Sequence, residues 1–147
     1  MYHNIKKNKM ARTKIDYGID LGTTNSAISR MENGESALIK ITGQGDTMPS
    51  CVAYNRNGIL IGKSAYGAYR SEKEKSLSKK IKPNAFIEFK RTMGTDKKYI
   101  SEFGGDLSSE QLSAEVLKSL KSFVTDENFS SIVITIPTAF KANQIDT

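Results

Sequence analysis

Two runs of alternating apolar and polar residues, joined by a very short polar segment, constrain this chain more than any other feature. The first run ends at Asp20, the second covers Ala27–Met31, and the loop between them is centred on Gly22–Thr24. Alternation with a period of two is typical of strands, so the pattern predicts two antiparallel strands joined by a tight loop. The turn pair Asn33–Gly34 and a third run at Ala37–Ile41 extend the predicted hairpin to three strands.

The loop between the first two strands has the composition of a phosphate-binding turn. Gly22 has no side chain, so the backbone can approach an anion closely. Successive backbone N–H groups can form a cradle for an anion, and Thr23 and Thr24 add hydroxyl donors. Asp20 can hold Mg²⁺ directly or through water, because Mg²⁺ takes one or two carboxylates together with phosphates and waters. These residues predict a site for a metal-bound phosphate chain, and the structural alternative is a hairpin with an ordinary polar loop.

The string Y-G-I-D-L-G-T-T-N-S at Tyr17–Ser26 resembles the first phosphate loop of the actin-like ATPase superfamily, and in detail it resembles the heat-shock protein 70 (DnaK-type) chaperones. Three later segments extend the resemblance. They are M-P-S-C-V-A-Y at Met48–Tyr54, F-K-R-T-M-G at Phe89–Gly94 and V-I-T-I-P-T-A-F at Val133–Phe140. Their order and approximate spacing match the family over Ile15–Gln144, which is nearly the whole chain.

The resemblance implies a role for each polar residue around the loop. The residues that correspond to the family's contacts with ATP or ADP are Gly22, Thr23, Thr24 and Asn25. Asp20 corresponds to a Mg²⁺ ligand that acts through water. Lys90 corresponds to the lysine that reaches the γ-phosphate and the attacking water, where an ammonium offsets negative charge on the transferring group. We therefore expect Lys90 to be catalytic, and the alternative is an ordinary surface lysine at the end of a helix.

The resemblance also implies an α/β fold, the N-terminal lobe of an actin-like ATPase domain with ribonuclease H-like architecture. Such a lobe has a mixed sheet of about five strands, packed helices and a small inserted α+β subdomain. We expect a basic disordered tail at residues 1–14, a core at residues 15–49 and 107–147, and the inserted subdomain at residues 50–106. In the family the second phosphate loop and the adenosine pocket follow later, so this half-domain alone is expected to lack ATP turnover.

Local signals predict the remaining elements. Ser50–Tyr54 and Gly58–Ile61 are expected to form a hairpin with its turn at Asn55 to Gly58, followed by a polar helix over Lys63–Ser78. Asn84 is expected to cap a short helix from Ala85 to about Met93. The string G-I-L-I-G-K-S from Gly58 is one residue short of a P-loop, and its three central apolar residues favour a strand whose ladder uses the N–H groups that a P-loop leaves free.

The last third of the chain carries the strongest helix signal. Ser108 and Gln111 form a capping box, and apolar residues then recur at helical spacing. The residues of this stripe are Leu112, Val116, Leu120 and Phe123. A short strand is expected near Tyr99–Phe103. The run Ser131–Ile136 is apolar enough to predict a buried strand, which Pro137 ends.

Composition excludes several other classes of protein. The single cysteine, Cys51, excludes an internal disulfide and lies in an apolar run, which predicts a buried, inert thiol. One cysteine and one histidine, His3, cannot build a zinc site. The N-terminus lacks the apolar core of a signal peptide, and no run approaches the roughly 20 apolar residues of a membrane span. We expect a cytoplasmic protein without membrane binding.

The charge of the chain says little about its partner. The formal charge is +6, and five of the basic residues lie in residues 1–14, so nucleic-acid binding is not expected. In the full-length family member, ATP hydrolysis drives cycles of binding and release of unfolded polypeptides. The partners that the resemblance implies are those polypeptides, a J-domain co-chaperone and a nucleotide-exchange factor. Pro137 corresponds to the family's proline switch, whereas Ile145 replaces a family arginine, which weakens the expected coupling to a substrate-binding domain.

Three alternative functions remain open. The first lobe of a sugar kinase of the same superfamily resembles D-x-G-T-T-S-x-R more closely, whereas this chain has Asn25–Ser26 after the threonines and has the pair Lys90–Arg91. A non-catalytic, filament-forming actin relative would sediment in the presence of ATP. A basic nucleic-acid-binding module would bind with steep salt dependence and would lose binding together with the lysine-rich tail.

Overall fold

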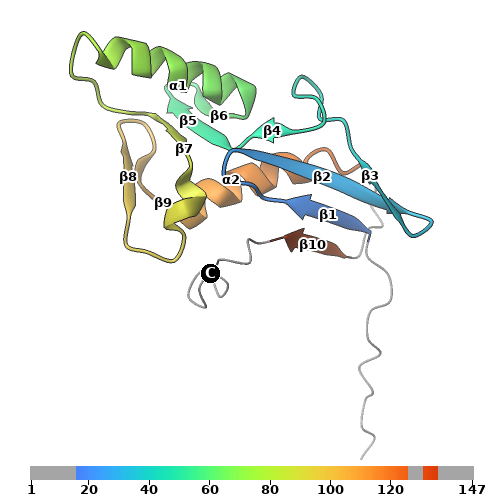
Figure 1. The fold of residues 1–147 in the computed structure, drawn as a ribbon. Helices are drawn as coiled ribbons and strands as arrows, with labels where there is room; N and C mark the ends of the chain where they lie inside the picture. Colours follow the sequence, from blue (N-terminus) through green and yellow to red (C-terminus); the bar gives the residue numbers. More distant parts are fainter. Residues whose placement is uncertain (1–15, 126–130, 136–147) are drawn as a thin grey trace, which may run out of the picture.

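The opening segment supplies the first three strands of the main sheet, as the alternating pattern predicts, although the third strand begins and ends earlier than the predicted Ala37–Ile41 (Figure 1). In the computed structural model, which describes residues 16–125 and 131–135, β1 (Tyr17–Asp20) pairs antiparallel with β2 (Asn25–Glu32), and β2 pairs antiparallel with β3 (Glu35–Leu38). The turn residues Asn33 and Gly34 have φ angles of 52° and 83°. Positive φ at both positions suits a two-residue hairpin turn, so the Asn-Gly prediction is confirmed.

Two further described strands belong to the same sheet. β10 (Ile132–Thr135) runs parallel to β1, and β4 (Met48–Pro49) pairs antiparallel with β2. Within the described residues the sheet therefore has five strands, in the order β10-β1-β2-β3 with β4 alongside β2, and the predicted mixed sheet is confirmed.

The prediction of a buried strand at Ser131–Ile136 is wrong for the side chains that the structure describes. Val133 and Ile134 are 43% and 44% exposed. Among the described strands, β10 lies at the end of the order and has β1 as its neighbour. A strand in this position has less cover than a central strand, so its apolar composition does not ensure burial.

A smaller sheet follows, with the order β6-β5-β7. Its strands are β5 (Cys51–Asn55), β6 (Gly58–Ile61) and β7 (Ala85–Ile87), and α1 (Lys63–Ser76) packs against them. The β5–β6 hairpin is confirmed, and so is the strand-then-helix interpretation of the segment that nearly spells a P-loop. Asn55 pairs with Gly58, so the turn residues are Arg56 and Asn57. The side-chain oxygen of Asn55 accepts a hydrogen bond from the Asn57 N–H at 2.8 Å.

The predicted helix from Ala85 to Met93 is wrong. The segment divides into β7 and a short 3-10 helix, η1 (Phe89–Thr92), and Glu88 between them has a φ of 55°. β7 forms because Ala85 and Phe86 are buried while the strand pairs with β5. Asn84 does not cap a helix, since its side-chain oxygen accepts hydrogen bonds from the Ser101 hydroxyl at 2.7 Å and from the Glu102 N–H at 2.8 Å. Long-range strand pairing therefore overrode a local capping signal.

The helix predicted to begin at Ser108 is confirmed. β8 (Lys98–Ser101) and β9 (Gly105–Ser108) form a hairpin, and α2 (Ser109–Lys121) follows directly. The Ser108 hydroxyl accepts from the Gln111 N–H at 3.2 Å, and the Gln111 side chain accepts from the Ser108 N–H at 2.7 Å. These two bonds are the predicted capping box.

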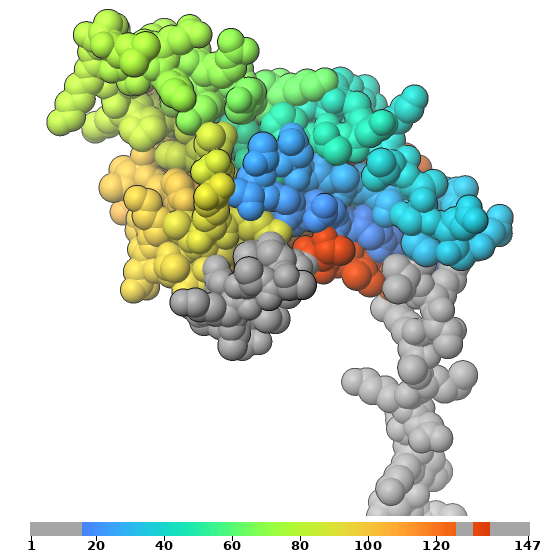
Figure 2. All heavy atoms as spheres, in the orientation of Figure 1, coloured from blue at the N-terminus to red at the C-terminus, as the bar shows by residue number. Residues whose placement is uncertain are grey.

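One hydrophobic core joins α2 to both larger sheets. Leu112, Val116 and Leu120 on α2 are fully buried, as the periodic stripe predicts. They belong to one cluster with residues from the strands and from η1: Tyr17, Ile19, Ile28, Val52, Phe86 and Phe89. α1 lies on the outside of the molecule and shows as the green end of the space-filling view (Figure 2).

Some predictions fall outside the described residues. These concern the tail at residues 1–14, Pro137 and Ile145. Within the described part of the chain, no helix combines the length and the apolar character that crossing a bilayer requires.

Candidate functional site

The loop between β1 and β2 requires glycine at position 22 for a reason internal to the loop. A β-carbon on Gly22 would collide with the backbone carbonyl of Asn25. Asn25 begins β2 and pairs with Pro49 of β4, so its backbone cannot move without disturbing that strand pairing. Glycine therefore permits the tight bend itself, in addition to the close approach of an anion that the sequence predicts.

Two buried serines close the loop through a ring of hydrogen bonds. The Gly22 N–H donates to the Ser26 hydroxyl at 3.2 Å, and the Ser50 hydroxyl donates to the Gly22 carbonyl at 2.8 Å. The two hydroxyl oxygens lie 2.8 Å apart. Because the Ser50 proton goes to the carbonyl, the Ser26 hydroxyl must donate to Ser50, which fixes the direction of every bond in the ring.

The ring holds the loop in one shape. Ser26 and Ser50 are 1% and 2% exposed, and the Ser50 N–H also donates to the Thr24 carbonyl at 2.8 Å. No sequence signal assigns these serines a role, although both lie within the strings that carry the family resemblance. The hydrogen bond between the two hydroxyls joins β2 to the residue after β4, so it depends on tertiary structure.

The predicted phosphate contacts remain accessible at this loop. Thr23 is half-buried, whereas Thr24 and Asn25 are exposed. Within the described residues, no hydrogen bond occupies the backbone N–H groups or the hydroxyls of Thr23 and Thr24. Two free amides and two free hydroxyls on a rigid bend fit an anionic oxygen ligand.

A cavity of about 160 Å³ lies beside the loop. It is lined by the two threonines, by the end of β4 and the residue after it, and by residues of the smaller sheet, α1 and the turn before η1: Pro49, Ser50, Cys51, Tyr66, Ile87 and Glu88. The loop therefore faces a hollow rather than packed protein.

Asp20 ends β1 and is exposed. Its carboxylate accepts a hydrogen bond from the Thr135 hydroxyl at 2.8 Å, and the two residues are partners in the β1–β10 ladder. Thr135 thus orients the carboxylate, a role that the sequence does not indicate because the two residues are far apart in the chain.

Lys90 is only 3% exposed, so the alternative of an ordinary surface lysine is wrong. Burial lowers the pKa of Lys90, and the negative charge of Asp20 opposes this shift. The interaction places the Lys90 ammonium within electrostatic reach of the Asp20 carboxylate, just before the loop.

The short helix η1, which carries Lys90, is held in place by Thr92. The Thr92 hydroxyl lies 2.7 Å from that of Ser109 and 2.8 Å from that of Tyr99.

The donor set suits a magnesium-bound phosphate chain better than a metal held by protein alone. Among residues 16–125 and 131–135, no cluster of three or more histidine, cysteine, aspartate or glutamate side chains could hold a metal. Asp20 offers one carboxylate, which matches the way Mg²⁺ is held through one or two carboxylates, with phosphate and water completing the shell.

Sequence comparison identifies relatives of this chain. The profile of the family described as Hsp70 protein matches residues 16–146. The chain is 37% identical over 129 residues to the chaperone protein DnaK of Mycoplasmoides gallisepticum, an alignment covering 84% of this chain and 20% of that protein. It is 36% identical over 138 residues to the chaperone protein DnaK of Mycoplasma mycoides subsp. mycoides SC, covering 92% of this chain and 21% of that protein.

The chain spans about a fifth of the length of these curated relatives. The matched residues contain the whole β1–β2 loop, η1 and β10, which are the elements that form the site. The match over nearly the full chain and the identity to two DnaK proteins show that the chain belongs to the Hsp70 family.

Proposed function

We propose that this chain is the ATP-binding N-terminal lobe of an Hsp70 chaperone, with its nucleotide site at the β1–β2 loop and Lys90. One observation carries the proposal. The buried ammonium of Lys90 lies within electrostatic reach of Asp20, which precedes the loop that Ser26 and Ser50 hold in place. Burying a cation is costly, so its retention beside a carboxylate supports a functional role.

Each residue has a distinct part in the proposed site. The amides and hydroxyls of Thr23 and Thr24 bind phosphate oxygens, while Gly22 permits the bend and Asn25 contacts the nucleotide at the loop's end. Mg²⁺, when bound, neutralises charge on the phosphates. Asp20 positions that ion through water.

Lys90 acts at the transferring phosphate. Its ammonium binds the γ-phosphate and the attacking water, offsetting charge that develops during transfer. The low exposure of its side chain restricts its geometry, so little reorganisation is needed when the phosphate chain arrives.

The domain organisation is also part of the proposal. Residues 15–49 and 107–147 form the core of the lobe, and residues 50–106 form an inserted subdomain that contains the smaller sheet and α1. In the full-length protein, ATP hydrolysis drives binding and release of unfolded polypeptides in the cytoplasm. A J-domain co-chaperone and a nucleotide-exchange factor are the proposed partners.

A chimera tests the site. Residues 16–146 replace the matching lobe of the Mycoplasmoides gallisepticum DnaK, and single-turnover ATP hydrolysis is measured. We expect Lys90→Ala to reduce the rate by about 100-fold or more, the usual cost of removing one group that stabilises transition-state charge. Lys40→Ala, at an exposed lysine outside the site, is the matched control and should retain the rate.

ATP binding is measured on the same chimeras. If all three bind ATP and hydrolyse it at one rate, Lys90 is not catalytic. If the unsubstituted chimera folds but does not bind ATP, the lobe assignment itself fails.

A further inference from the structure

α1 and the connector after it carry a concentration of positive charge. Residues 63–82 contain seven basic residues and two acidic ones, whereas the net charge of the whole chain is +6. The ion pairs formed among the described residues lie elsewhere, at Arg30–Glu32, Arg91–Glu88 and Lys118–Glu115. The seven cations of this segment are therefore not neutralised by a described salt bridge.

One of the two carboxylates in the segment is committed to the backbone. Glu72 accepts hydrogen bonds from the Asn84 N–H at 3.0 and 3.1 Å and from the Ala85 N–H at 3.1 Å. These bonds fasten the connector to α1. They also leave Glu74 as the only carboxylate of residues 63–82 that is not bonded to the backbone, so the cationic character of the surface persists.

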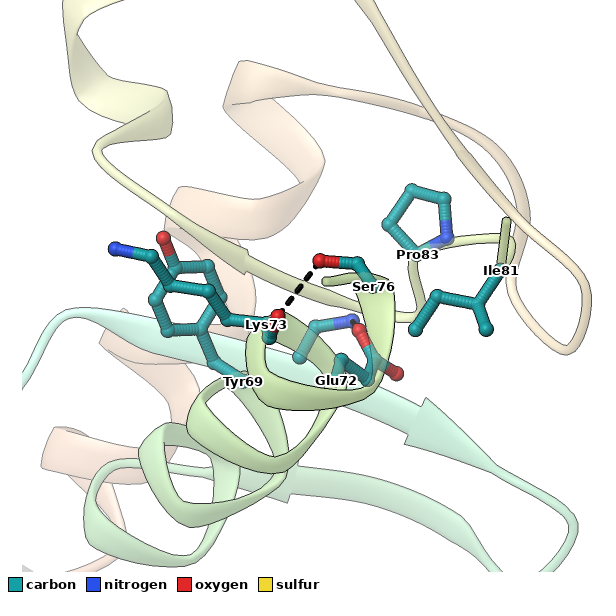
Figure 3. Close-up of a pocket in the computed structure, with 7 residues that line it drawn as sticks. Tyr69, Glu72, Lys73, Ser76, Ile81 and Pro83 are labelled. Atoms are coloured by element: carbon teal, nitrogen blue, oxygen red, sulfur yellow. Dashed lines mark hydrogen bonds between the residues drawn. The ribbon is translucent and has the colours of Figure 1, made fainter. Parts of the chain in front are cut away.

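An open pocket of about 260 Å³ lies between α1 and the fastened connector (Figure 3). Figure 3 shows Tyr69 and Lys73 on the helix at one side of it, with Ile81 and Pro83 of the connector at the other. Ser76, Ala85 and the backbone-bonded Glu72 also contribute to the lining. An apolar interior beside a lysine suits an apolar or aromatic side chain next to an acidic residue.

The neighbouring face of α1 continues the same surface. Tyr66 and Tyr69 stack with ring centroids 6.0 Å apart, and a second hollow of about 310 Å³ lies beside them. Arg70, Glu74 and Leu77 line this hollow, and Leu77 is 87% exposed. Tyr69 and Lys73 line both hollows, so the two form one continuous surface.

We propose that this α1 surface, made of Tyr66, Tyr69, Arg70, Lys73, Leu77 and the adjoining pocket, docks an acidic polypeptide segment that inserts one apolar or aromatic side chain. Charge complementarity selects an acidic partner, because the cations of the segment lack described carboxylate partners. The apolar pocket favours a polypeptide over a nucleic acid, because it offers a place for an aliphatic or aromatic side chain rather than for a phosphate.

The test uses the purified chain and fluorescently labelled probes. The first probe is a short peptide of aspartate and glutamate around a central phenylalanine, and the second has serine in place of the phenylalanine. The third is a single-stranded oligothymidylate of equal charge. Binding is followed by fluorescence anisotropy at physiological salt. We expect the phenylalanine peptide to bind at least about tenfold more tightly than either of the other probes.

Two variants distinguish the contribution of positive charge to peptide binding from the contribution of the pocket. Lys73→Glu should weaken binding of the phenylalanine peptide by about tenfold or more, whereas Lys40→Glu, the same reversal at an exposed lysine outside the surface, should change it by less than about twofold. Ser76→Phe, which fills the pocket from α1, should reduce that peptide's affinity to the level of the serine peptide. Ser64→Phe, at an exposed position on the same helix outside both hollows, is its control.

Thermal unfolding of each variant verifies that it is folded. The proposal is overturned if the oligothymidylate binds as tightly as the phenylalanine peptide, since the surface would then recognise charge alone. It is also overturned if the folded Lys73→Glu and Ser76→Phe variants bind like their controls, or if no peptide binds.

Discussion

Lys90 and Asp20 lie close enough that the carboxylate raises the lysine's pKa against the lowering effect of burial. η1 carries the ammonium and β1 carries the carboxylate, so the relationship joins two segments that are far apart in sequence. Because Asp20 precedes the loop of Gly22–Thr24, this electrostatic proximity brings the proposed catalytic residue near the proposed phosphate site.

The isolated chain should show no sustained ATP turnover, because the proposed site is one wall of a nucleotide cleft. Phosphate release from the purified chain with Mg²⁺ and ATP measures this. The background should be the same for Lys90→Ala. Sustained release that disappears in Lys90→Ala would contradict the proposal that one lobe is insufficient.

Gly22→Ala should destabilise the fold by roughly 2 kcal/mol or more, since the new β-carbon meets the backbone carbonyl of Asn25. Gly67→Ala is the matched control, because Gly67 lies within α1 and a β-carbon there meets no atom within 4 Å. That control should stabilise the chain by about 0.5–1 kcal/mol through helix propensity. Urea unfolding followed by circular dichroism gives both values, and equal stability of the two variants would rule out the collision.

Ser50→Ala should cost about 1–3 kcal/mol, because it leaves the partly buried Gly22 carbonyl and the buried Ser26 hydroxyl without their partner. The double variant Ser26→Ala/Ser50→Ala should cost less than the sum of the two single changes, with a coupling of about 0.5 kcal/mol or more. Ser36→Ala, on the exposed strand β3, should change stability by less than about 0.5 kcal/mol. Strictly additive losses would show that the two hydroxyls do not form a ring.

Cys51 should make the chain less stable at alkaline pH. Burial, reinforced by the charge of Glu72, raises the pKa of Cys51 from 9.0 to about 12. Between these values the unfolded thiol loses its proton while the folded one keeps it, so stability falls as pH rises, by up to about 1.4 kcal/mol per pH unit.

The comparison of the native chain with Cys51→Ala isolates this contribution. The raised pKa of Tyr54 acts in the same direction and the lowered pKa of Lys90 in the opposite one, and both are common to the two proteins. Urea unfolding across the alkaline range should show a steeper loss for the native chain. Parallel pH profiles, or rapid reaction of the folded protein with a thiol reagent at neutral pH, would contradict the burial of this thiol.

Local chemistry was enough to predict several elements. The Asn33–Gly34 turn and the capping box of Ser108 with Gln111 depend on residues that are neighbours in the chain, and both appear as predicted. The stripe on α2 is likewise a matter of spacing within one helix. The family resemblance, carried by short strings, gave the mixed sheet and the candidate residues of the loop.

Tertiary structure decided what depends on distant partners. Ala85–Ile87 is a strand because β5 offers it hydrogen bonds, although the preceding Asn84 looks like a helix cap. Val133 and Ile134 are exposed because β10 ends the described sheet. In both cases the outcome depends on the segments that pair with the strand or cover it. Those segments lie outside any local window of the sequence.

The same division applies to the candidate site. The sequence by itself determined the chemical groups: a carboxylate at Asp20, a glycine with two hydroxyls after it, and an ammonium at Lys90. Only the folded chain decided that Ser50 closes the loop, that Thr135 orients Asp20 and that Lys90 is buried within reach of it. The physical reason is that hydrogen bonds, desolvation and Coulomb interactions depend on distance in space, which residue order does not specify.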